Sequence, residues 1–85
     1  MKVLEYRSDV TMLKICGQIF AVEQNYFFNP TVAAINKNGE LWIYEEAPRL
    51  INDEEWESSC GGFELIAIVS DFDDYTIPHP IEQLN

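Results

Sequence analysis

An Asn-Gly dipeptide, Asn38-Gly39, separates two runs of β-prone residues. Asn and Gly tolerate the positive φ angles of a type I′ turn, so this pair is a strong signal for a β-hairpin. The sequence therefore predicts a hairpin at about 31–45. With Asn38-Gly39 as a two-residue loop, Ile35 faces Trp42 across the two strands. A three-residue loop with Gly39 in a bulge shifts every pair by one residue, and the sequence alone leaves both registers open.

A second strand is predicted from Phe63 to Val69, because glycines precede it and an acidic turn follows it. Apolar residues occupy both of its faces, which indicates a central strand. Trp42 and Phe63 are expected in the core, whereas Trp56 and Tyr75 could be core or surface. In a regular strand one face carries four apolar residues, Phe63, Leu65, Ala67 and Val69.

The N-terminal third is less regular. Residues 2–6 and 10–15 are expected to form short strands, Gly17 is a break, and residues 19–28 are expected to form a longer strand that stops before a proline. Residues 10–14 fit one face of a short helix equally well, so periodicity does not decide between the two structures here.

Two further segments depart from the strand pattern. Asn52 is a suitable N-cap and acidic residues follow it, which predicts a short helical segment at about 52–58. Pro78 and Pro80 flank His79 near the end of the chain. Because proline has no N–H for a sheet ladder, this tail is expected to run extended and outside any central strand.

These elements predict one domain over residues 1–85. The fold class is mostly β (or α+β), with an antiparallel sheet of four to six strands. Sandwich, small barrel and α+β arrangements all fit this description. Hydrophobic residues make up 47% of the chain, which is enough for a core despite the charge.

The net charge is −10, and all five basic residues lie before residue 50. Direct binding of nucleic acid needs Lys and Arg against phosphates, and an anionic membrane surface attracts the same residues, so neither partner is expected. A protein with a basic surface is the partner that this charge favours.

Few residues suit catalysis or metal binding. His79 is the only histidine, and Cys60, although it precedes Gly61-Gly62, has acidic rather than basic neighbours, which weakens a thiol nucleophile. A calcium loop that starts at Asp71 would need glycine at its sixth position, where Thr76 stands. We therefore expect no enzyme activity, no metal and no cofactor.

The acidic residues of the second half, with nearby aromatic side chains, form the candidate partner-binding surface. Alternate carboxylates on a strand lie about 6.6 Å apart, a spacing compatible with mimicry of the charges on DNA. The candidate residues are Glu45, Glu46, Asp53, Glu54, Glu55, Trp56, Glu57, Asp71, Asp73, Asp74 and Tyr75.

A pattern Val-Ala-Ala-Ile-Asn-x-Asn-Gly-Glu-Leu-Trp-x-Tyr-Glu-x-x-Pro runs from Val32 to Pro48, and Trp56 and the strand at 63–69 follow. With this pattern, about half of the chain resembles small phage and prophage proteins, many of which have no assigned function. The N-terminal third and the tail depart from that family. The resemblance implies a phage origin and provides no catalytic residues.

Small size, negative charge and the phage resemblance together favour a non-enzymatic inhibitor of a host protein. A nucleic-acid-binding or defence component is the expected target, as for anti-restriction or anti-CRISPR factors. A structural or accessory module of a phage particle or replication apparatus is the alternative, followed by a small-ligand sequestering protein. No signal peptide is recognisable, so the cytoplasm of the host cell is the expected location. The oligomeric state is left open.

Overall fold

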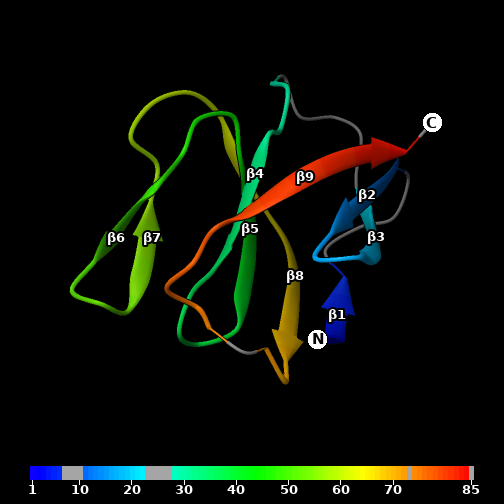
Figure 1. Ribbon diagram of the computed structural model, residues 1–85, viewed down its shortest axis with the longest axis horizontal. Helices are drawn as coiled ribbons and strands as arrows, with labels where there is room; N and C mark the ends of the chain where they lie inside the picture. The colour runs from blue at the N-terminus through cyan, green and yellow to red at the C-terminus, as the bar shows by residue number, and fades with distance from the viewer. Residues whose placement is uncertain (7–10, 23–27, 73, 85) are drawn as a thin grey trace.

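The computed structural model describes residues 1–6, 11–22, 28–72 and 74–84, which form nine strands and no helix (Figure 1). No segment of this described part is a helix of the length and apolarity that a membrane crossing requires. The strands are β1 (Lys2–Tyr6), β2 (Thr11–Ile15), β3 (Gln18–Val22), β4 (Val32–Ile35), β5 (Glu40–Tyr44), β6 (Arg49–Ile51), β7 (Glu55–Glu57), β8 (Phe63–Ser70) and β9 (His79–Leu84).

Seven strands form one antiparallel sheet in the order β1-β8-β5-β4-β9-β2-β3, and β6 and β7 form a separate two-stranded hairpin. The predicted mostly β, antiparallel class is confirmed. The sheet holds seven strands, against four to six expected, because β9 joins two smaller groups of strands. Its end strands β1 and β3 do not pair with each other in the described part of the chain, so the sheet is open.

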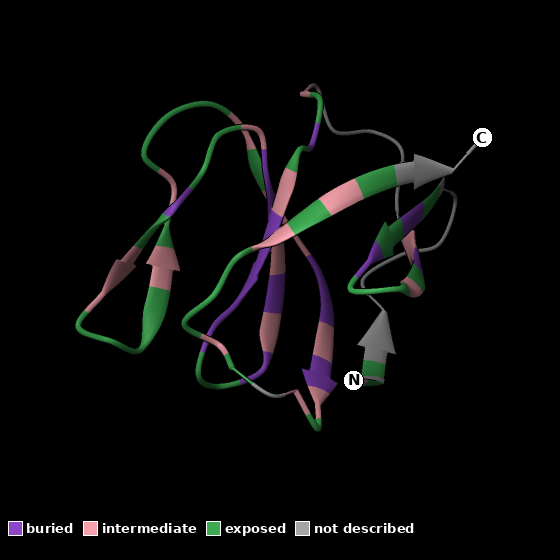
Figure 2. Cartoon of the chain, in the orientation of Figure 1, coloured by how far each residue is buried: buried purple, intermediate pink, exposed green. Residues whose placement is uncertain are grey.

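The core lies between the two parts of this sheet. Strands β2 and β3 supply buried residues to the same cluster as β4, β5 and β8, so the sheet must curl to bring them together (Figure 2). Burial of such side chains is the main driving force for folding. The cluster consists of Leu13, Ile15, Phe20, Ala33, Ile35, Leu41, Ile43, Ile66, Ala67 and Val69.

The predicted hairpin is present as β4 and β5, in the three-residue register. Ile35 pairs with Leu41 and Ala34 with Trp42, so the two-residue register, with Ile35 opposite Trp42, is wrong. The N–H of Gly39 donates to the carbonyl of Asn36 at 2.9 Å, and Gly39 takes a φ of 96°. Only the glycine of the Asn-Gly pair has a positive φ, which is why the loop is longer than in a type I′ hairpin.

Strand β8 is central as predicted, because it pairs with β1 on one side and β5 on the other. A bulge interrupts the pairing with β5: Trp42 is opposite Leu65, whereas the preceding residue of β5, Leu41, is opposite Ala67. An extra residue reverses the alternation of side chains. Phe63 therefore does not share the core face of Ala67, and its side chain is 53% exposed rather than buried in the core as expected.

The predicted helical segment at 52–58 is wrong. Asn52 and Asp53 adopt positive φ angles of 52° and 55° and form the turn between β6 and β7, closed by a hydrogen bond from Glu54 N–H to Ile51 O at 3.0 Å. Asn and Asp accept this left-handed conformation more readily than most residues. The acidic residues that suit a first helical turn thus flank a hairpin turn instead.

The C-terminal tail also differs from expectation, because β9 lies inside the sheet between β4 and β2. Its first two residues pair with β4, and the segment from Ile81 onward pairs with β2. Pro80 is the last residue paired with β4, at the point where the strand changes its neighbour. A proline is tolerated there because the ladder on each side covers only part of the strand.

In the N-terminal third, β1 matches the strand expected at 2–6. Leu13 is buried and Lys14 is exposed on β2, so these residues alternate as in a strand, and the helical alternative for 10–14 does not hold for the residues described. Residues 16 and 17 form a tight turn with positive φ angles of 53° and 75°. The long strand expected at 19–28 begins as β3, while residues 10 and 23–27 lie outside the described residues.

Candidate functional site

The hairpin of residues 49–57, which we call the acidic hairpin, contains four of the predicted contact carboxylates. Asp53, Glu54, Glu55 and Glu57 are all exposed. Figure 1 shows β6 and β7 set apart from the sheet, and Figure 2 shows no fully buried residue on either strand. The structure therefore brings these four side chains together on one projecting element.

Two exposed ion pairs neutralise part of this charge. Lys37 Nζ lies 3.8 Å from Glu54 Oε1, and Arg49 Nη2 lies 3.5 Å from Glu57 Oε2. Each of the four side chains is at least half exposed. Exposed pairs of this kind contribute little to stability and exchange readily with other charged groups. The acidic hairpin thus already holds one lysine and one arginine of its own chain by weak contacts.

Four hydrogen bonds attach the acidic hairpin to the rest of the molecule. The Trp56 N–H donates to Asn36 Oδ1 at 2.7 Å, and the Lys37 N–H donates to the Glu54 carbonyl at 2.8 Å. The Trp56 indole donates to the Tyr75 carbonyl at 2.8 Å, and the Tyr75 hydroxyl donates to the Asp53 carbonyl at 2.6 Å. These bonds come from two separate segments, so the hairpin is held in one orientation. Trp56 and Tyr75 are both half-buried structural anchors.

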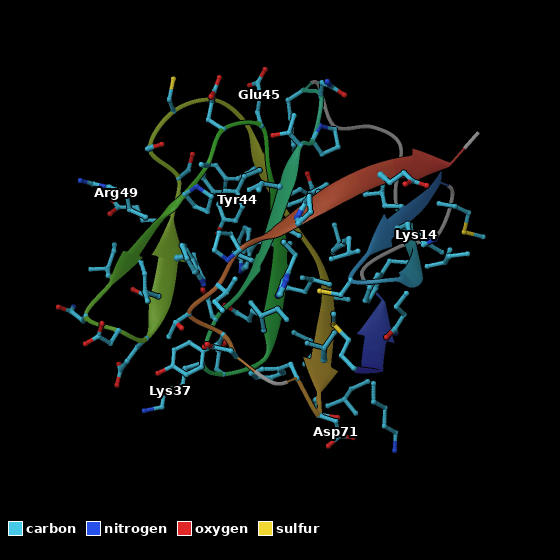
Figure 3. All side chains as sticks on the ribbon, in the orientation of Figure 1. Lys14, Lys37, Tyr44, Glu45, Arg49 and Asp71 are labelled. Carbon is cyan, nitrogen blue, oxygen red and sulfur yellow. The ribbon has the colours of Figure 1, made fainter. Side chains whose placement is uncertain are left out.

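A pocket of about 440 Å³ separates the acidic hairpin from the face of β5 and β8. Trp42 and Phe63 have ring centroids 5.8 Å apart, and Tyr44 stacks near Phe63 at 6.3 Å. Trp56 lines the pocket from the hairpin. Figure 3 shows Tyr44 between the acidic hairpin and the strands of the sheet. Offset and tilted aromatic pairs of this kind are favourable. Of the three rings, Phe63 is exposed, Trp42 is half-buried and Tyr44 is buried.

The pocket also has acidic walls. Glu40, Glu55 and Glu57 line it, and no lysine, arginine or histidine does so among the described residues. Glu40 Oε1 accepts hydrogen bonds from Asn36 Nδ2 at 3.1 Å and from the Trp42 indole at 3.4 Å. Burial, with a smaller contribution from the charge of Glu40, raises the pKa of Tyr44 to about 12. Ionisation of the Tyr44 hydroxyl, which would place a second negative charge near Glu40, is therefore unfavourable.

The other predicted contact residues do not join this surface. Glu45 and Asp71 lie at opposite ends of the molecule in Figure 3. Glu45 Oε1 accepts the Gly62 N–H at 3.0 Å, which ties β5 to the start of β8. Asp71 has a φ of 59° in the turn after β8, and Asp74 accepts hydrogen bonds from Thr76. Glu46 is exposed beside Glu45, and Asp73 lies outside the described residues.

Sequence analysis missed the sheet side of the pocket. Glu40, Trp42 and Tyr44 alternate along β5, so they share one face, while Leu41 and Ile43 point into the core. This alternation of acid and aromatic residues was a usable signal. The expectation that Trp42 lies in the core, which the structure contradicts because Trp42 is only half-buried, concealed this face.

A second hollow, of about 300 Å³, surrounds His79, with Asp71, Asp74 and Cys16 on its walls. No group of three metal-ligating side chains occurs in the described residues. Cys16 and Cys60 are exposed and are not bridged to each other. Burial lowers the pKa of His79, and the nearby Asp74 partly opposes this effect. The neutral imidazole is therefore the form that the fold favours.

We expect His79 to titrate below its ordinary pKa of 6.5. Because the folded pKa is depressed, the stabilisation from the neutral imidazole is complete above about pH 6.5 and is lost as the pH falls through the folded pKa. Proton NMR of the His79 ring gives this midpoint directly. Between about pH 7.5 and 5.5, the melting temperature of the variant His79→Gln should fall by less than that of the parent protein. A midpoint at or above 6.5 would contradict the assignment.

The molecule combines an exposed acidic hairpin, attached by four hydrogen bonds, with a pocket of aromatic and acidic walls. Such a combination suits the recognition of positively charged groups. No protein-family model, curated protein or solved structure matches this chain.

Proposed function

We propose that this chain is a non-enzymatic binding protein that inhibits a host protein by covering its basic surface. The target is a nucleic-acid-binding or defence protein, and the acidic hairpin is the main contact element. The observation that carries the proposal is the attachment of this hairpin. Four carboxylates are displayed within five residues on an element held by four hydrogen bonds.

Fixed geometry favours binding, because association then requires little ordering of the surface. Glu55 and Glu57 are alternate residues of β7, so their side chains leave the strand on the same side, about 6.6 Å apart. A protein that neutralises phosphates presents rows of Lys and Arg, and carboxylates in a row can occupy those residues. The net charge of −10 adds long-range attraction to such a partner.

The phage resemblance supports an origin in which the target belongs to the host. Binding is favoured over catalysis because the carboxylates of the acidic hairpin are exposed to water. General acid–base catalysis instead uses groups whose surroundings separate their pKa values. The proposed action is therefore occupation of the target's nucleic-acid surface, with no chemical step.

The proposal is tested by affinity capture from host lysate, followed by a binding titration with the recovered protein. We expect the variant Asp53→Asn/Glu54→Gln/Glu55→Gln to bind about tenfold more weakly at low salt, as three exposed charge contacts predict. Higher salt should weaken the parent protein as well. Addition of the parent protein should release nucleic acid from the target in a competition assay.

The matched control is Glu46→Gln/Asp71→Asn/Glu82→Gln, which removes the same charge from exposed positions outside the hairpin. Circular dichroism establishes that both triple variants are folded. An equal loss of affinity in the two variants would show that net charge, rather than the acidic hairpin, controls binding. A captured target that keeps its nucleic acid would contradict inhibition by occupation.

A further inference from the structure

We propose that the pocket between the acidic hairpin and β5–β8 binds the guanidinium group of an arginine side chain from the partner. This inference rests on the proposed function, because it assigns one partner side chain to one cavity. It adds a specific site to a contact that is otherwise distributed over exposed charges.

The walls of the pocket suit a flat cation. Phe63 is 53% exposed, and the centroid of its ring is 5.8 Å from that of Trp42 and 6.3 Å from that of Tyr44. The faces of aromatic rings attract cations through their quadrupoles, and a guanidinium plane also stacks on them. The indole of Trp42 points its N–H toward Glu40, 3.4 Å away, so this ring and the carboxylate are held relative to each other.

The charge of the pocket selects the same class of ligand. Glu40 and Glu55 line it and are in no ion pair with a described lysine or arginine. A planar guanidinium can donate two parallel hydrogen bonds to a carboxylate while its face contacts a ring. Arg49 does not line the pocket, but it contacts Glu57, which does, at 3.5 Å, so this carboxylate already accepts a guanidinium.

Other ligand classes fit less well. A phosphate or carboxylate would meet three glutamates and no described basic side chain in the pocket. A purely apolar ligand would bury the charges of Glu40 and Glu55 without neutralising them, which is costly. A lysine ammonium satisfies the charge but has no plane to stack on the rings. The arginine side chain is the natural group that satisfies both requirements.

The test uses the full chain labelled with ¹⁵N and titrated with Nα-acetyl-arginine amide. We expect the indole N–H signals of Trp42 and Trp56 to shift with saturation. The matched ligand Nα-acetyl-citrulline amide has nearly the same shape without the charge and should bind at least about tenfold more weakly, as loss of a cation–π contact and a charged hydrogen bond predicts. The lysine analogue should bind more weakly than the arginine ligand.

Variants locate the site. Glu40→Gln and Phe63→Leu should each weaken binding of the arginine ligand by about three- to tenfold. Glu46→Gln removes one charge at an exposed position outside the pocket and should change the affinity by less than about twofold. Phe63 is exposed, so its substitution leaves the core unchanged.

Three results would overturn the inference. They are equal binding of the citrulline ligand, tighter binding of the lysine ligand, or no shift of either indole signal at about 100 mM arginine ligand, a concentration that would saturate even a millimolar site.

Failure of the pocket inference is distinguishable from failure of the proposed function. If the pocket fails but the acidic-hairpin variant still loses its captured partner, the proposed function stands. If arginine binds the pocket but no nucleic-acid-binding protein is captured, the arginine site is supported and the proposed function is not.

Discussion

We expect the substitution Gly39→Val to lower the stability of the domain by about 3 kcal/mol. Gly39 has a φ of 96°, and a left-handed conformation costs an L-residue about 1–2 kcal/mol. A β-carbon at this position would lie 2.6 Å from the carbonyl oxygen of Val69, so β8 and the loop would also have to separate. Crowding of this kind costs about 1–3 kcal/mol more. In thermal unfolding, the melting temperature should fall by about 12–24 °C.

The matched control is Gly17→Val. Gly17 has a φ of 75°, but no atom lies within 4 Å of a β-carbon built there. This variant should therefore show only the cost of the backbone conformation, about 1–2 kcal/mol. A fall of the same size at both positions would show that the contact with Val69 is unimportant. An unchanged melting temperature for Gly39→Val would contradict the three-residue loop itself.

We expect Asn36→Leu to cost about 2–4 kcal/mol and to loosen the acidic hairpin in particular. Asn36 is 7% exposed, accepts the Trp56 N–H and donates to Glu40. Leucine fills a similar space, but it leaves the half-buried Trp56 N–H without its acceptor and removes a hydrogen bond to the carboxylate of Glu40. Urea unfolding gives the change in stability. Hydrogen exchange should show the Trp56 amide exchanging faster, relative to the core strands, than in the parent protein.

Asn38→Ala is the control for this second prediction. The side chain of Asn38 is exposed and accepts one hydrogen bond, from the Glu40 N–H at 3.1 Å. Its loss should cost about 1 kcal/mol or less and should leave exchange of the Trp56 amide unchanged. If the two asparagine variants behaved alike, Asn36 would not be the anchor of the acidic hairpin.

Local turn chemistry was sufficient to predict the β4–β5 hairpin but not its register. The carbonyl of Gly39 accepts the Val69 N–H at 2.8 Å, so a distant strand helps to hold the loop. At Asn52, by contrast, the local sequence predicted the wrong structure, a helix. Asn and Asp favour both helix N-termini and left-handed turns, and the chain here forms the turn. The Trp56 N–H then bonds to Asn36, twenty residues earlier in the chain, a contact that no local pattern reveals.

Only the part of the candidate site that consists of closely spaced acidic residues could be predicted from the sequence. The four carboxylates of the acidic hairpin were found because they are adjacent in the sequence. Phe63 was misplaced because a bulge in β8, which depends on the pairing with β5, reverses its face. The pocket combines side chains from β5, β7 and β8, and it exists only because the acidic hairpin stands over one face of β5. Such a cavity requires tertiary structure before it can be recognised.

The position of β9 has a consequence for how the protein is made. This strand provides the hydrogen-bonded link between β4 and β2, and it is the last of the described strands to be synthesised. While residues 79–84 remain inside the ribosome, the β2–β3 hairpin cannot be joined to the strands that complete the core. Until β9 emerges, a nascent chain therefore exposes apolar surface, a state prone to aggregation. Completion of the sheet therefore waits for β9, and its rate is limited by the closure of long loops.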